Sequence, residues 1–240
     1  MTDLYILPGL DGTTRMLDGF MAAAQPSFAT VASVAYPTDV VMDYRALETF
    51  ARAALPRDVP FVLIGESFSG PIAISIAADP PPNLIGLVLS TTFARTPVPL
   101  LAPFASLTRF APTRALPTAA LSAVLLGRWA TPALLHTLRA ALGDVAPAVQ
   151  RARAAAAMRI DVSDRLARIV VPTLLLKANH DRLLRPGASR QLLAGIAHAR
   201  QIALDGPHLL LQTRSDRCAE AVARFAESIG GGAVSQPGDQ

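Results

Sequence analysis

A single serine lies where an apolar run changes into a helical pattern, in the segment VLIGESFSGPIA at residues 62–73. Ser67 has small residues two positions before and after it, Gly65 and Ser69, and Gly70 follows at once. A sharp strand-to-helix turn crowds the backbone, so it needs small flanking residues, and it exposes a hydroxyl beside the free N–H groups of a helix N-terminus. This placement suits an acyl-transfer nucleophile. From this segment alone, a plain turn that contains a serine remains the alternative.

Two later segments carry side chains that could act together with this serine. Asp181 follows an expected strand at residues 173–176 in LLLKANHDRLLRP, and His208 follows another at residues 201–204 in QIALDGPHLLLQTRSD. Ligand chemistry in open parallel sheets gathers beyond the carboxyl ends of the strands. Ser67, Asp181 and His208 each lie just past such an end, in the order Ser, Asp, His, so we expect them to gather at that edge of the sheet.

The elements that must position these residues follow from the apolar runs. Six short runs are nearly continuous in apolar character, as strands buried on both faces are, and they cover residues 4–7, 30–35, 61–64, 84–89, 173–176 and 201–204. Helical patterns alternate with them at residues 15–24, 43–54, 69–78, 186–196 and 215–228. The alternation predicts an α/β fold, with a parallel sheet of about six strands flanked by helices.

One long segment interrupts the alternation. Residues 93–162 show no convincing strand, and prolines divide them into short helical patterns. We predict that they form a helical cap over the carboxyl edge of the sheet, with a core of residues 1–92 and 163–229 and a disordered tail at 230–240. Candidate pocket walls in this predicted cap are Phe104, Phe110, Leu121, Leu125, Trp129 and His136.

The motifs LPGLDGT, GESFSG, NHDRLLRP and GPHLLLQTR occur in the same order as in a known family. In these motifs the chain resembles an α/β-hydrolase-fold serine hydrolase of the esterase and lipase-like family, over nearly its whole length. The resemblance implies Ser67 as the nucleophile, His208 as general base and then acid, and Asp181 as the residue that orients His208. It also implies an oxyanion hole formed by the backbone N–H groups of Leu10 and Phe68.

The chain departs from the family's pattern at two residues. Ser69 stands where many members have the last glycine of G-x-S-x-G, and serine is small enough to keep the turn. Pro8 stands where many members have the histidine of a His-Gly pair, which leaves only backbone groups in that loop.

A third departure concerns the sheet. The first expected strand begins almost at residue 1, so the two strands that usually precede it, one of them antiparallel, are expected to be missing. The resemblance then implies six parallel strands, with residues 30–35 at one edge, followed by 4–7 and then 61–64.

Some residues offer alternative roles. Asp205 could replace Asp181 as the acid, but it follows its strand too directly to curl back easily, so we favour Asp181. His180 could compete as the base, but it adjoins Asp181, and adjacent residues point apart, so we favour a loop role. Glu66, beside the nucleophile, is interpreted as structural or weakly tuning.

Composition narrows the classes of function. The chain has 240 residues, a net charge of +4 and a pI near 10.0, but Lys177 is the only lysine and the arginines are scattered, so we expect no nucleic-acid partner. No run reaches the roughly 18 apolar residues of a membrane span. The first residues, MTDLYILPGL, lack the basic and long apolar regions of a secretion leader, so we do not expect one. We expect a cytoplasmic protein without stable membrane insertion. Cys218, the only cysteine, lies on an apolar helical face, and no metal-ligand or phosphate-loop spacing occurs, so we expect no metal or cofactor.

The resemblance implies a cofactor-independent hydrolase that cleaves carboxylic esters with an apolar acyl or alcohol group through an acyl-enzyme. Its partner would be a small-molecule ester. Acyl transfer, thioester cleavage and lyase-type elimination remain alternatives, because the fold supports all of them. A non-catalytic ligand-binding protein is a further alternative. The sequence does not determine the physiological substrate or the oligomeric state.

Overall fold

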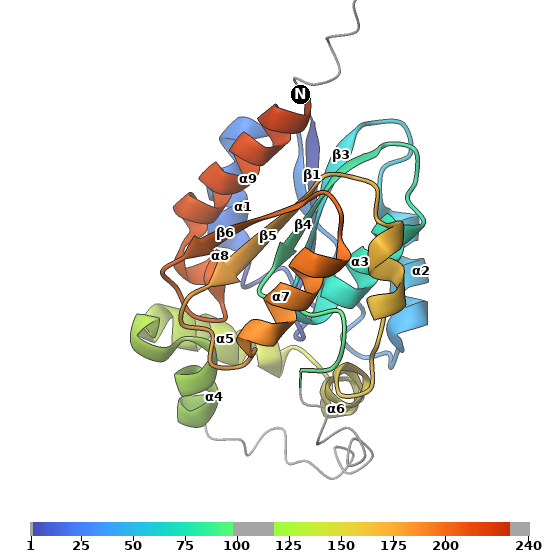
Figure 1. The fold of residues 1–240 in the computed structure, drawn as a ribbon. Coiled ribbons are helices and arrows are strands. Elements are labelled where there is room, and N and C mark those ends of the chain that lie inside the picture. Colours follow the sequence, from blue (N-terminus) through green and yellow to red (C-terminus); the bar gives the residue numbers. More distant parts are fainter. Residues whose placement is uncertain (1, 98–117, 231–240) are drawn as a thin grey trace, which may run out of the picture.

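The six apolar runs form one sheet in the computed structural model, which describes residues 2–97 and 118–230 (Figure 1). The strand order is β2-β1-β3-β4-β5-β6, and every pairing between neighbours is parallel. The predicted six-stranded parallel sheet, with the second run at its edge, is therefore confirmed. The strands are β1 (Asp3–Leu7), β2 (Val31–Ser33), β3 (Phe61–Glu66), β4 (Leu84–Ser90), β5 (Thr173–Ala178) and β6 (Ala199–Leu204).

Helices cover both faces of the sheet, as Figure 1 shows. In β3, Phe61 and Leu63 face the layer that holds α2 and α3, whereas Val62 and Ile64 face the layer that holds α1 and α9. Burial of both faces explains why β3 is apolar from Phe61 to Ile64 instead of alternating. The edge strand β6 differs, because Arg200 and Gln201 are exposed. The α-helices are α1 (Asp18–Ala24), α2 (Tyr44–Ala54), α3 (Gly70–Ala78), α4 (Thr118–Leu125), α5 (Pro132–Gly143), α6 (Pro147–Ala157), α7 (Pro186–Gly195), α8 (Leu210–Thr213) and α9 (Ser215–Gly230).

The ends of several elements differ from the sequence prediction. The edge strand β2 is shorter than residues 30–35, and α1 begins at Asp18 instead of residue 15 because residues 14–17 form a turn closed from Leu17 N to Thr14 O. The short helix α8 and the 3₁₀ helix η5 (Ser163–Arg168) were not predicted. Helix α9 continues through Gly230, which we had assigned to the tail, and residues 231–240 lie outside the described residues.

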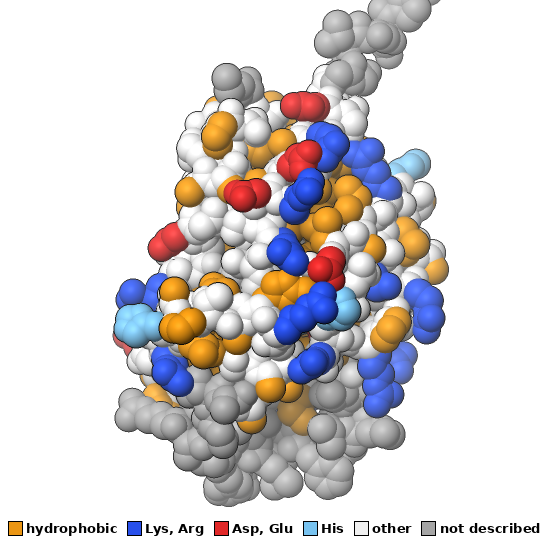
Figure 2. All heavy atoms as spheres, turned by 90° about the vertical axis from the view of Figure 1, so that its left-hand side faces the viewer, with side chains coloured by type: hydrophobic (Ala, Val, Ile, Leu, Met, Phe, Trp, Pro, Cys, Tyr) orange, Lys and Arg blue, Asp and Glu red, His pale blue; other side chains and the backbone are white. Residues whose placement is uncertain are grey.

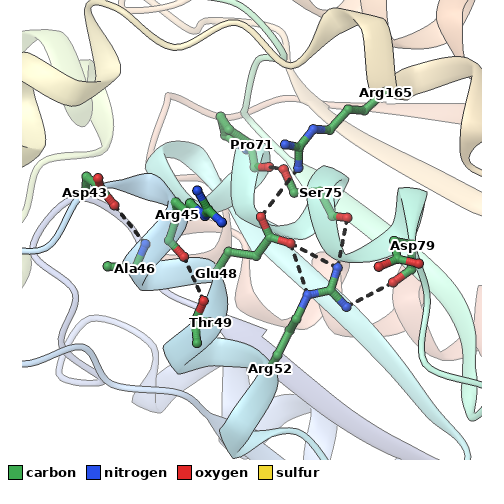
Figure 3. Close-up of polar contacts among 10 residues, drawn as sticks. All are labelled: Asp43, Arg45, Ala46, Glu48, Thr49, Arg52, Pro71, Ser75, Asp79 and Arg165. Carbon is green, nitrogen blue, oxygen red and sulfur yellow. Dashed lines mark hydrogen bonds and ion pairs between the residues drawn. The ribbon is translucent and has the colours of Figure 1, made fainter.

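An arginine on α2 holds this helix against α3, the helix that follows Ser67 (Figure 3). The guanidinium of Arg52 donates to the carbonyls of Ser75 and Asp79, at 3.1 and 2.9 Å. These carbonyls lie in the last turn and at the C-cap of α3, where a cation is favoured by the helix dipole. Glu48 pairs with Arg52 at 3.0 Å and with Arg165 of η5 at 3.4 Å. The network therefore fixes α3 from its C-terminal end.

The helices α4, α5 and α6 of the predicted cap lie beyond the carboxyl ends of the strands (Figure 1). The leucines of α4 and α5, together with Leu126 between these helices, form a separate apolar cluster that also includes Met16 and Leu209 from the core. At the base of the segment, an isolated antiparallel bridge joins Arg95 to Asp161. Two of the candidate pocket residues, Phe104 and Phe110, lie outside the described residues.

Acidic and basic side chains lie next to one another on the face shown in Figure 2. On α9, Glu220 pairs with Arg217 at 3.5 Å and with Arg224 at 2.6 Å. Exposed pairs of this kind contribute up to about 1 kcal/mol each. Within the described ranges, no helix is both long enough and apolar enough to cross a membrane.

Candidate active site

Ser67 stands in a sharp turn between β3 and α3. Its φ is 46°, in the left-handed region that residues other than glycine rarely adopt, at a cost of about 1–3 kcal/mol. Gly65 makes the turn possible, because a Cβ at that position would lie 2.5 Å from the Cβ of Ala73. The hydroxyl of Thr92 donates to the carbonyl of Ser67 and holds the turn from the end of β4. The strained backbone presents the partly exposed Ser67 hydroxyl at the edge of the sheet.

The three residues singled out in the sequence form one hydrogen-bonded chain. Ser67 Oγ lies 2.8 Å from His208 Nε2, and His208 Nδ1 lies 2.8 Å from Asp181 Oδ2. The other oxygen of Asp181 accepts from the backbone N–H groups of Leu183 and Leu184, both at 2.8 Å. An ionised carboxylate at Nδ1 requires the proton on that nitrogen, so Nε2 of the neutral ring is free to accept the serine proton.

The carboxylate that contacts His208 is that of Asp181 and not that of Asp205. Asp205 is 56% exposed and pairs with His180 at 2.9 Å, Arg128 at 3.1 Å and Arg214 at 3.4 Å. The indole of Trp129 covers this cluster, with its ring 4.2 Å from the Arg128 guanidinium carbon and 5.3 Å from the His180 ring. His180 therefore has the loop role we favoured, and Trp129 packs beside the loop that carries the acid.

The loop after β1 turns back on itself directly beside Ser67. Gly12 N–H donates to Gly9 O at 3.0 Å, which leaves the N–H of Leu10 outside the hydrogen bond of the turn. Ser69, which replaces the usual glycine, donates its hydroxyl proton to the carbonyl of Pro8 and accepts from the hydroxyl of Tyr36 at 2.8 Å. The departure at position 69 therefore supplies a tie between the turn at Ser67 and the loop that carries Leu10.

Phe68 holds the other expected oxyanion donor. Its ring is buried and stacks on Tyr44 with 4.8 Å between the ring centroids, and the Tyr44 hydroxyl donates to Phe68 O at 3.0 Å. Burial raises the pKa of Tyr44 well above its usual range, so this hydroxyl stays a donor at all ordinary pH values. The peptide groups around Phe68 are therefore fixed at the N-terminus of the helical segment, where N–H groups lack helical acceptors.

Glu66, beside the nucleophile, is a buried carboxyl beneath the loop after β1. It is 2% exposed and accepts from Gln212 Nε2 at 2.8 Å. Burial raises its pKa to about 7, and the charge of Asp11 adds to this, while Gln212, the charge of His208 and the Gly9 amide oppose it. The carboxyl therefore changes its charge near neutral pH, within reach of the loop that carries Leu10.

The remaining pocket candidates lie in different surroundings. Leu125 packs with Leu121 and Leu209 in the apolar cluster of the predicted cap, and its carbonyl accepts from Leu209 N–H at 3.1 Å. Because Leu209 follows His208, this bond joins the predicted cap to the loop of the base. His136 is exposed on α5 and lines a surface cavity of about 340 Å³ with Arg15 and Gln212.

Sequence reasoning missed a buried arginine and a tyrosine. Arg153 on α6 is 2% exposed and contacts the loop after β1, and Tyr36 lies between it and Ser69. An arginine in the run RARAAAA carries no sequence signal for burial, because such residues usually lie on a solvated helical face. Within residues 2–97 and 118–230, no three His, Cys, Asp or Glu side chains gather as metal ligands would.

Residues 29–206 match a family model described as serine aminopeptidase, S33. Among solved structures, the chain is similar to a hydrolase from Pseudomonas aeruginosa PA01, with 21% identity, a TM-score of 0.77 and coverage of 94% of this chain and 89% of that one. An enol-lactonase from Burkholderia xenovorans LB400 is 20% identical, with a TM-score of 0.77 and coverage of 94% of this chain and 91% of that one. A thermophilic esterase from Thermogutta terrifontis is also 20% identical, with a TM-score of 0.77 and coverage of 95% of this chain and 90% of that one. At these identities the likeness is one of fold. Comparison with curated proteins finds no match.

Proposed function

This chain belongs to the S33 serine aminopeptidase family of α/β-hydrolases, and we propose that it cleaves carboxylic esters that carry an apolar acyl or alcohol group. The observation that carries the proposal is the hydrogen-bonded chain from Ser67 through His208 to Asp181, with 2.8 Å at each step. Two similar structures are named an esterase and an enol-lactonase, whereas the family model is named for an aminopeptidase, so the test below compares esters with aminoacyl anilides.

The first half of the reaction forms an acyl-enzyme. Ser67 Oγ attacks the ester carbonyl carbon while its proton passes to His208 Nε2, and the carboxylate of Asp181 stabilises the resulting imidazolium. The negative carbonyl oxygen accepts from the N–H groups of Leu10 and Phe68. The bond from carbon to the alcohol oxygen then breaks, and His208 returns its proton to the departing alcohol.

The second half releases the acid. A water molecule gives a proton to His208 Nε2 and attacks the acyl carbon, and the same two N–H groups stabilise the oxyanion. The bond to Ser67 Oγ breaks, and His208 protonates the serine. His208 is 2% exposed, so its ring is largely shielded from bulk water.

The apolar preference rests on the surroundings of His208. Leu209 follows it directly and belongs to the apolar cluster with Met16, Leu125 and Leu126. An apolar group placed against such side chains gains about 25 cal/mol for each Å² removed from water. Residues 93–162 would then act as the cap that contributes these side chains.

A panel of chromogenic substrates tests the proposal. Wild-type protein should hydrolyse p-nitrophenyl acetate and octanoate faster than the matching thioesters or aminoacyl p-nitroanilides. Ser67→Ala should abolish turnover without changing the thermal unfolding midpoint, whereas Ser27→Ala, at an exposed serine, should leave turnover unchanged. A fluorophosphonate should label wild-type protein at Ser67 only. Turnover of thioesters or anilides without ester hydrolysis, or full activity in Ser67→Ala, would overturn the proposal.

A further inference from the structure

A buried arginine from the predicted cap contacts the loop that carries Leu10. The guanidinium of Arg153 donates from Nη1 to Leu10 O at 3.1 Å and to Asp11 O at 2.6 Å, and from Nη2 to Pro37 O at 2.9 Å. A charged group that is 2% exposed is costly unless its donors are satisfied, so these carbonyls are needed to keep it there.

The neighbouring residues leave a space that fits this side chain. Gly12 has a φ of 70°, and a Cβ at that position would collide with Nη1 of Arg153. The ring of Tyr36 faces the guanidinium, with 5.6 Å from its centroid to Cζ. The carboxylate of Asp11 supplies a nearby negative charge. The side chain of Arg153 is therefore surrounded by the backbone of Gly12, the ring of Tyr36 and the carboxylate of Asp11.

The loop is held from two opposite sides. On the core side, Ser69 donates to Pro8 O, and Tyr36 N–H donates to Gly12 O at 2.8 Å. On the side of the predicted cap, Arg153 holds the carbonyl of Leu10. The N–H of Leu10 shares a planar peptide group with the carbonyl of Gly9, which accepts from Gly12 N–H at 3.0 Å, so the turn sets its direction. Arg153 holds the next two carbonyls, those of Leu10 and Asp11, and thereby fixes the rest of the same turn.

We propose that Arg153 is a positioning residue for the oxyanion hole: by holding the carbonyls of Leu10 and Asp11 it fixes the turn at residues 9–12, so that the N–H of Leu10 points at the developing oxyanion. This inference rests on the proposed function, because it takes Leu10 N–H as a donor to the substrate. It also makes α6 a fixed wall of the site and not a moving lid. Two further contacts agree: Ala146 N–H donates to Thr38 O at 2.8 Å, and Arg15 pairs with Asp144 at 2.7 Å.

Two substitutions separate positioning from bulk packing. Arg153→Met keeps the apolar stem and removes every donor, so kcat should fall about 100-fold while KM changes less than about twofold, as expected when a transition-state contact is misplaced. Arg153→Lys keeps the charge without the fork of donors, so its kcat should lie between that of wild type and Arg153→Met. Arg159→Met removes an exposed arginine just beyond α6 and should leave both constants unchanged.

Hydrogen exchange gives a readout that does not depend on turnover. The amides of residues 10–12 should exchange at least about tenfold faster in Arg153→Met than in wild type, while the amides of β3 and β4 keep their protection. If Arg153→Met does not fold, the same comparison is made with Arg153→Lys, in which the increase should be smaller but present.

Either of two results would overturn the inference: kcat within about twofold of wild type in both variants, or unchanged exchange at residues 10–12. Failure of the proposed function gives a different pattern. In that case wild-type protein itself shows no ester turnover and no fluorophosphonate labelling, while the exchange measurement still decides whether Arg153 holds the loop.

Discussion

Glu66, the buried carboxyl beneath the loop after β1, should make the protein less stable as the pH rises towards neutral. Burial raises its pKa from 4.5 to about 7. Below pH 4.5 the carboxyl is protonated in both the folded and the unfolded chain, so it has no effect. Between these values the unfolded chain loses the proton and the folded protein keeps it, so rising pH favours unfolding. Above the pKa of Glu66 in the folded protein, both states have lost the proton, so the free energy of unfolding stops falling.

The size of this effect follows from the raised pKa. Each pH unit between the unfolded and folded values contributes about 1.4 kcal/mol, so the free energy of unfolding should fall by about 3 kcal/mol between pH 4.5 and pH 7. The groups that face Glu66 are Gln212, the Gly9 amide, Asp11 and His208. All of these groups remain present when position 66 alone is changed, so the pH-dependent difference between the two proteins reports Glu66 together with its electrostatic coupling to them.

The variant Glu66→Gln provides that comparison. Its amide can accept from Gly9 and donate to Gln212 Oε1, which is buried without a hydrogen-bond partner among the described residues. Urea unfolding followed by circular dichroism, from pH 4.5 to pH 8, should show the variant gaining about 3 kcal/mol relative to wild type. Glu220→Gln, at an exposed glutamate on α9, should show no such gain. A difference between wild type and Glu66→Gln that stays constant with pH would refute the reasoning.

Four further substitutions test the site. Asp181→Asn should lower kcat about ten-thousandfold, because the imidazole then adopts the wrong tautomer, while Asp205→Asn should change it less than about threefold. The reverse order would move the role of the acid to Asp205. Gly65→Ala should lower the free energy of unfolding by about 1–3 kcal/mol in urea titrations, since its Cβ meets that of Ala73, and an unchanged value would contradict the crowded turn. Trp129→Ala should reduce hydrolysis of p-nitrophenyl acetate and octanoate equally, because the ring packs beside the acid loop; a loss confined to octanoate would place the ring in the pocket.

Much of the fold could be predicted from the sequence because the signals are local. A strand buried on both faces is apolar at every position, and β3 shows this from Phe61 to Ile64. The crowded turn at Ser67 likewise requires small neighbours, which lie within a few residues of it. Element ends were less predictable, as at α1, because a turn at residues 14–17 competes with the helical pattern there.

The sequence favoured Asp181 over Asp205 as the partner of His208, but only the tertiary structure shows which of the two contacts it. Asp181 and Asp205 each follow a strand near the same edge of the sheet, so their spacing in the chain left both open. The structure places Asp181 against His208, whereas Asp205 contacts His180 and Arg128 at the surface. The direction of a side chain in a loop depends on its neighbours in space, and these come from other segments.

The contacts of the loop after β1 could also not be predicted from the sequence. Sequence motifs pointed to Leu10 and Ser67, but not to Arg153, which is 143 positions from the carbonyl of Leu10. A buried guanidinium is stable only where several carbonyls converge on it, and these come from the loops after β1 and β2. That convergence exists only once α6 packs against both loops, so no pattern within α6 could encode it.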